Sequence, residues 1–166
     1  MTETSLLTES SLQTDSLLLI GSSAGMNGVA DRARSHSRRV VQFATIPEAL
    51  PAVPDARLII LFQHWPDEYP PTEISQLLNA APLSRLMVCQ SAWCASFGRT
   101  RQTWPPAVCV DESRWMLRFN KELSVLSGES APLPWTAGLD EVFAFDYGEW
   151  VSHDSTVHDS MITASR

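Results

Sequence analysis

Small and hydroxyl-bearing residues follow the first strongly apolar run of the chain, in an arrangement that could bind an anion. Residues 21–28 read GSSAGMNG, directly after the run LLLI. Where a strand passes into a helix, backbone amides and the helix dipole favour phosphate groups, so Gly21, Ser22, Ser23 and Gly25 are candidate ligands. The glycine spacing differs from the dinucleotide-binding GxGxxG, and no Walker lysine is present. A plain flexible turn is the alternative interpretation.

Further polar residues follow later apolar runs and could join these ligands. His64 comes just after the most apolar run, Ser91 just after the next one, and Arg99 and Arg101 lie in the segment beyond. Because the carboxyl ends of parallel strands meet at one edge of a sheet, we expect these groups together there, on an edge that is neutral to basic. Guanidinium groups suit an anion or an acidic partner. The alternative is that both arginines pair with neighbouring acids or loop carbonyls.

No complete catalytic or metal-binding set accompanies these residues. The three cysteines, Cys89, Cys94 and Cys109, form no CxxC pair, and no histidines stand at zinc-finger spacing. They are typical of buried thiols in a reducing compartment, with Cys94 the thiol most open to exposure because it follows a strand in a polar stretch. His64 is isolated, as a structural hydrogen bonder usually is. We therefore expect no catalytic residue, no metal and no cofactor.

The elements that must position these residues can be read from apolar runs and helix signals. Amphipathic patterns predict helices over residues 25–36 and 72–81, and a third between Asp111 and Gly128. Thr45 and Glu48 form a capping box for a short helix that Pro51 and Pro54 are expected to end. A long loop is predicted over 94–106. Strands are predicted at 16–20, 39–44, 56–62, 85–89 and 107–110.

Short apolar strands that alternate with helical segments predict an α/β fold. We expect a three-layer, doubly wound, five-stranded parallel sheet of order 2-1-3-4-5, as in flavodoxin-like proteins. The predicted organisation is a disordered tail over 1–14, one domain over 15–128, an aromatic extension over 129–150 and a disordered tail over 151–166. The extension is too aromatic for a free tail, so it should pack on the domain or on a partner.

Composition excludes several classes of protein. The net charge of −7 is concentrated at the ends, because residues 16–130 hold ten acids and eleven bases. A nearly neutral body without a recognisable DNA-binding helix pair argues against nucleic-acid binding. No apolar run approaches the roughly 18 residues that span a bilayer, and the first residues carry no Lys or Arg, unlike a signal peptide. A cytoplasmic protein without membrane association is expected.

One stretch resembles a known family. Leu58–Pro66 followed by Asp67-Glu68-Tyr69, with Glu48-Ala49-Leu50 upstream, is similar to the receiver domain of bacterial response regulators, over residues 15–127. The segment from Ser91-Ala92-Trp93-Cys94 to Pro105-Pro106 is also similar to an uncharacterised bacterial group of receiver-like proteins. The resemblance implies a signalling domain whose chemistry depends on acids at the carboxyl edge of the sheet.

Most of that chemistry is missing when the motif is carried over. The acidic pair after the first strand corresponds to Ser22 and Ser23, and the phosphoacceptor aspartate, four residues before Pro66, corresponds to Phe62. The hydroxyl residue after the fourth strand is retained as Ser91. The lysine that closes strand five is absent, since that run leads into Asp-Glu. The resemblance therefore implies a pseudo-receiver that accepts no phosphate, because a phosphorylatable carboxylate and carboxylate ligands for a cation are both lacking.

Three hypotheses remain open. The first is a non-catalytic, receiver-like regulatory domain that binds a protein partner or forms a homodimer. The second is a flavodoxin-like protein that binds a phosphate-bearing ligand or a flavin at residues 21–28, with Trp65, Tyr69 and Trp93 stacking on the isoalloxazine. The third, an enzyme, has least support, because neither a Ser/His/Asp nor a Cys/His set can be assembled.

Overall fold

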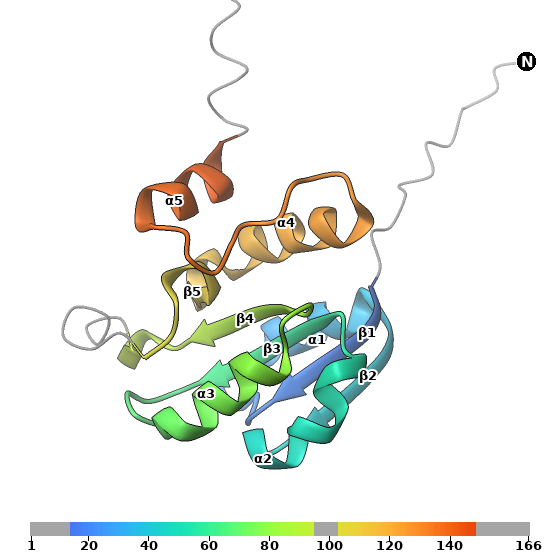
Figure 1. The fold of residues 1–166 in the computed structure, drawn as a ribbon, viewed down its shortest axis with the longest axis vertical. Helices are drawn as coiled ribbons and strands as arrows, with labels where there is room; N and C mark the ends of the chain where they lie inside the picture. Colours follow the sequence, from blue (N-terminus) through green and yellow to red (C-terminus); the bar gives the residue numbers. More distant parts are fainter. Residues whose placement is uncertain (1–13, 95–102, 149–166) are drawn as a thin grey trace, which may run out of the picture.

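A parallel sheet forms the centre of the molecule in the computed structural model, which describes residues 14–94 and 103–148 (Figure 1). In these ranges the sheet has five strands in the order β2-β1-β3-β4-β5, and every pairing is parallel. The predicted α/β class and the order 2-1-3-4-5 are thus confirmed. The strands are β1 (Thr14–Ile20), β2 (Ser37–Phe43), β3 (Leu58–Gln63), β4 (Arg85–Gln90) and β5 (Cys109–Asp111).

Strand β3 is the centre of the core. All six of its residues are buried, as expected for a strand with neighbours on both sides and helices on both faces. Its side chains alternate between two apolar clusters. Ile59 and Leu61 point to one cluster, while Leu58, Ile60 and Phe62 point to the other. This alternation fixes the register, because a shift by one residue would exchange the two sets.

The helices cover the two faces unequally. Side chains of α1 (Asn27–Ser35) and α4 (Trp115–Ser127) pack in the cluster that contains Phe62. The short helix α2 (Ile46–Ala49), the 3₁₀ helix η1 (Leu50–Asp55) and helix α3 (Pro71–Ala80) pack in the other cluster. Figure 1 shows this layering, with α2 and α3 on the face opposite α1.

Local signals set most helix ends, with two differences from the prediction. The Thr45 hydroxyl accepts a hydrogen bond from the Glu48 amide at 3.4 Å, but the Glu48 carboxylate bonds the amide of Ala44 at 3.3 Å, one residue further back than a capping box requires. Helix α2 is short and ends at Ala49, before Pro51, as predicted, but the chain continues as the 3₁₀ helix η1, which contains both Pro51 and Pro54. Pro51 lies in the first turn of η1, where an amide has no intrahelical partner, whereas Pro54 lies inside η1 and removes one donor.

The connection between β4 and β5 carries short 3₁₀ turns in its described parts. These are η2 (Ala92–Cys94) and η4 (Pro106–Val108), and the predicted loop 94–106 otherwise falls largely on residues outside the described ranges. Trp104, buried to 3 % exposure, packs in the core on the α3 face. Strand β5 begins at Cys109, later than predicted, because Ala107 and Val108 belong to η4.

The aromatic extension packs on the domain itself. It ends in helix α5 (Leu139–Tyr147), which lies beside α4 and β5 in Figure 1. Leu133, Ala137 and Val142 are buried against Ala107 of η4, and Trp135 packs against the main core. Of the two outcomes considered for this segment, packing on the domain is the one observed. The predicted tails fall on residues outside the described ranges, except for Thr14 in β1.

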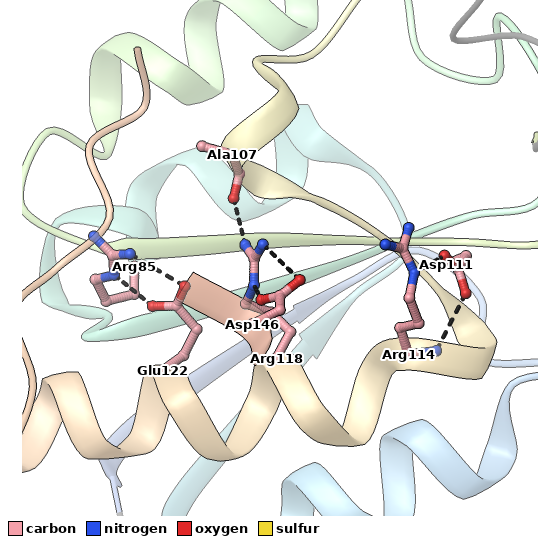
Figure 2. Close-up of polar contacts among 7 residues, drawn as sticks. All are labelled: Arg85, Ala107, Asp111, Arg114, Arg118, Glu122 and Asp146. Atoms are coloured by element: carbon pink, nitrogen blue, oxygen red, sulfur yellow. Dashed lines mark hydrogen bonds and ion pairs between the residues drawn. The ribbon is translucent and has the colours of Figure 1, made fainter. Parts of the chain in front are cut away.

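Two ion pairs, one buried and one partly buried, anchor α4 and the extension (Figure 2). Arg118 of α4 is 1 % exposed and pairs through two guanidinium nitrogens with Asp146 of α5, which is 3 % exposed. The same guanidinium donates to the carbonyl of Ala107 at 2.7 Å and lies over the Phe145 ring at 5.3 Å. Arg85 of β4 pairs with Glu122 of α4 at 2.7 Å and donates to the Leu133 carbonyl. Each arginine therefore joins three segments that are distant in sequence.

Removing one partner of the Arg118–Asp146 pair in Figure 2 tests how much this pair stabilises the fold. We expect Asp146→Ala to lower the free energy of unfolding by about 3 kcal/mol or more, because it leaves a charged guanidinium buried without its counterion. The double variant Arg118→Met/Asp146→Leu should recover much of that loss, since apolar replacement of a buried pair is often neutral. Urea denaturation followed by tryptophan fluorescence measures both.

The control for this experiment is Asp31→Ala, which removes an exposed ion pair to Arg34. It should change the free energy of unfolding by less than about 1 kcal/mol, as surface pairs do. Equal losses in Asp31→Ala and Asp146→Ala would show that burial of the Arg118 pair contributes nothing.

Candidate binding surface at the carboxyl edge of the sheet

The predicted site residues that the structure describes meet at one edge, at the carboxyl ends of β1, β3 and β4. The His64 ring nitrogen Nε2 lies 2.7 Å from the carbonyl oxygen of Ser22, and the Ser91 hydroxyl donates to the His64 carbonyl at 2.6 Å. His64 thus connects the loop after β1 to the loop after β4. Arg99 and Arg101, the predicted anion ligands, lie outside the described residues.

The loop after β1 uses several of its amides internally. The Ala24 amide donates to the Ser22 hydroxyl at 3.2 Å, and the Met26 amide donates to the Ser23 carbonyl at 2.9 Å. Gly21 and Gly25 both have positive φ, +91° and +79°, a backbone conformation that glycine adopts without steric cost. These bonds leave fewer donors for a phosphate than an open anion-binding loop would offer.

Apolar and phenolic groups fill the space around Phe62, which the receiver resemblance predicts to be the phosphoacceptor position. The Phe62 side chain is fully buried in the cluster shared with α1 and α4. The Tyr69 hydroxyl donates to the Phe62 carbonyl at 2.8 Å, and burial raises the pKa of this phenol above its ordinary value. A β-carbon on Gly21 would clash with the Tyr69 hydroxyl and lie 3.0 Å from the Phe62 carbonyl oxygen. Gly21 therefore lets the β1 end and Tyr69 approach closely.

A polar network that sequence reasoning missed braces the loop after β3. Buried Gln63 accepts from the Gln90 amide at 2.9 Å and donates to the Trp65 carbonyl at 3.2 Å. The Glu68 carboxylate accepts from the backbone amides of His64 and Trp65. The spacing of Glu68, four residues after His64, was the available signal, because a carboxylate at that distance can close a tight loop.

Two tryptophans lie exposed above this network. Trp65, after β3, and Trp93, in η2, have ring centroids 6.1 Å apart and an interplanar angle of 37°. Their exposed fractions are 56 % and 70 %. Large aromatic side chains are seldom left in water on two neighbouring loops unless the surface binds something. The pair is therefore the most conspicuous feature of this edge.

The prediction that Cys94 is the exposed thiol is wrong. Cys94 is 2 % exposed, and its thiol points to the Gln63 carbonyl at 3.6 Å, because η2 turns it into the protein. Burial raises its pKa, with smaller opposing effects from Ser91. Burial likewise raises the pKa of Cys89 and of Cys109 to about 12. All three groups are thus thiols near neutral pH, and none has the depressed pKa of a nucleophile.

A cleft of about 1220 Å³ opens beside the tryptophans, between the ends of β4 and β5 and helix α5. Its charged lining includes Asp111, Glu112 and Asp140 against Arg114, so the described lining of the cleft is acidic. The expectation of a neutral to basic edge rested on Arg99 and Arg101, which lie outside the described residues, and it stays a prediction. Although burial opposes it, hydrogen bonds from Ser113 and Arg114 hold the pKa of Asp111 below its usual value. Arg114 pairs with Asp111 at 2.5 Å (Figure 2).

Neither a metal site nor a known relative identifies the surface. Within residues 14–94 and 103–148, no group of three His, Cys, Asp or Glu side chains is arranged to hold a metal ion. In the same ranges no helix is long and apolar enough to cross a bilayer. Comparison with known proteins found no matching family model, no similar curated protein and no similar solved structure.

Substitution of the two glycines separates close packing from backbone strain. Gly25→Ala should cost about 1 kcal/mol of unfolding free energy, because its φ is positive but nothing lies within 4 Å of the added carbon. Gly21→Ala should cost at least about 2 kcal/mol, since it adds a clash with Tyr69 and displaces the hydrogen bond to Phe62. Thermal unfolding by circular dichroism measures both, and equal losses would contradict the packing of Tyr69 against Gly21.

Proposed function

We propose that this chain is a non-catalytic, receiver-like regulatory domain that binds a protein partner through the carboxyl edge of its sheet. The observation that carries the proposal is the combination of a filled acceptor position with an exposed aromatic pair on the same edge. Phe62 and Tyr69 occupy the interior there, and Trp65 and Trp93 face outward. The edge is therefore suited to binding a protein partner, not to phosphoryl transfer.

The chemistry of phosphoryl transfer supports this assignment. A receiver places a nucleophilic carboxylate and two or three further carboxylate oxygens around Mg²⁺. Positions Ser22, Ser23 and Phe62 supply none of these oxygens. The nearby acid Glu68 is engaged with two backbone amides. Asp67 lies exposed in the turn, with φ of +57°, four residues beyond the end of β3.

A ligand-binding protein with a phosphate or flavin site is the competing function. The internally bonded amides after β1 argue against it, as do two tryptophans that lie against each other instead of framing an open slot. A yellow preparation with flavin absorbance, or a thermal shift with flavin mononucleotide or inorganic phosphate, would favour this alternative over the regulatory domain.

Phosphate mimics provide the first test. Beryllium fluoride with Mg²⁺ should leave the melting temperature unchanged, and acetyl phosphate should add no mass, because no group of carboxylates among the described residues is arranged to hold a cation beside a phosphoryl group. Differential scanning fluorimetry and intact mass spectrometry measure the two. A Mg²⁺-dependent shift or an 80-dalton adduct on the folded protein, about one phosphoryl group, would refute the pseudo-receiver.

Partner capture provides the second test. The full chain, immobilised, should retain a defined protein from lysate of its source organism, and Trp65→Ser/Trp93→Ser should retain at least tenfold less, because aromatic anchors dominate binding energy. Leu83→Ser is the matched control, since Leu83 is 96 % exposed just before β4, at the other end of the sheet. Equal capture by the wild type and the double tryptophan variant would contradict the proposed surface.

A further inference from the structure

The cleft between the strand ends and α5 has features that specify a ligand class. Its volume is about 1220 Å³, larger than the roughly 300–1,000 Å³ of typical small-molecule sites. One wall is formed by the turn after β5 and the other by α5. The lining relevant to recognition consists of Trp104, Asp111, Glu112, Leu139, Asp140 and Phe143.

Helix α5 presents apolar side chains on this wall. Leu139 and Phe143, one turn apart, are 75 % and 63 % exposed, while Val142 and Asp146 on the inner side of the helix are buried. Phe143 also packs against Tyr147, with ring centroids 4.8 Å apart. An (i, i+4) pair of large apolar residues at the mouth of a cleft is a contact surface for another apolar group.

The walls carry carboxylates that no cation among the described residues pairs with. Asp111 and Asp146 are bound by Arg114 and Arg118. Glu112 and Asp140 differ, because no hydrogen bond or ion pair within the described part of the chain joins either carboxylate to another residue. They stand on opposite walls, Glu112 after β5 and Asp140 in the first turn of α5.

We propose that this cleft binds a peptide segment of the partner protein in which Arg or Lys flanks a bulky apolar residue. The proposal rests on the proposed function and names the chemistry of the partner. The apolar residue would lie against Leu139 and Phe143, and a cation would reach Glu112 and Asp140. An acidic rim opposes nucleic acid and anionic lipid, which present phosphates, and complementary charge would speed association with a basic segment.

Peptide selection tests the proposal with the whole chain. A displayed library of random 12-residue peptides is selected on the immobilised protein, and the recovered peptides should be enriched in Arg or Lys next to Leu, Phe or Trp. Binding of a selected peptide, measured by fluorescence anisotropy, should weaken at least tenfold in Glu112→Gln/Asp140→Asn and in Phe143→Ser. It should also weaken as salt is raised, because exposed charges are screened.

The matched control is Asp55→Asn/Glu129→Gln, which removes two exposed acids outside the cleft and should leave the peptide affinity unchanged. Both cleft carboxylates are exposed, so the charge variant should keep the wild-type melting temperature. Recovery of no peptides, recovery of peptides without basic residues, or equal binding by the charge variant would overturn the proposal. So would self-association of the chain that Glu112→Gln/Asp140→Asn abolishes, since a second copy would then be the occupant.

These outcomes are distinguishable from failure of the proposed function. If partner capture depends on the two tryptophans but no peptides are selected, the peptide-binding role of the cleft is overturned and the proposed regulatory function stands. If selected peptides bind the cleft but no partner depends on the tryptophans, peptide binding by the cleft is supported and the proposed partner surface at Trp65 and Trp93 is refuted.

Discussion

The buried guanidinium of Arg118 is the interaction on which the outer half of the molecule depends. It bonds Asp146 of α5 and the Ala107 carbonyl of η4 from a position within α4. Taking this pair out of water is costly, and the cost is offset only when all partners are in place. The arrangement therefore specifies one position for α5. That position forms a wall of the cleft and covers the side of the sheet beyond β5.

Hydrogen bonds within the protein also occupy the interior polar groups at the carboxyl ends of β3 and β4. Where a receiver would hold hydrated acids around a cation, Tyr69 donates to the Phe62 carbonyl, and Gln63 and Gln90 bond each other. The Glu68 carboxylate accepts hydrogen bonds from two backbone amides. These polar groups inside the edge thus have protein partners, whereas the buried indole nitrogen of Trp104, which lines the cleft, has no partner within the described residues. At its surface lie the Glu112 and Asp140 carboxylates, which form no ion pair within the described residues, and the exposed tryptophan pair. We therefore propose that this edge binds a protein partner.

Much of the fold was predictable because its signals are local. The apolar runs, the Thr45 cap and the left-handed glycine at position 128 mark strands and helix ends within a few residues. The site was predictable only in part. His64, Ser22 and Ser91 were expected together because parallel strand ends converge. The pairing of Arg118 with Asp146, 28 residues apart, and the approach of Tyr69 to Gly21 depend on tertiary packing that no local pattern encodes.

The central claim is that the Arg118–Asp146 pair holds α5 as an integral wall of the binding surface, and hydrogen exchange of the α5 amides tests it most directly. Native α5 should exchange as slowly as the solvent-facing part of α4. In Asp146→Asn, the α5 amides should lose their protection, whereas those of β1 and β3 should lose no more than the fall in the free energy of unfolding explains, because the lost interaction is local to the extension. Unprotected α5 amides in the wild type, or equal protection in the variant, would contradict the account.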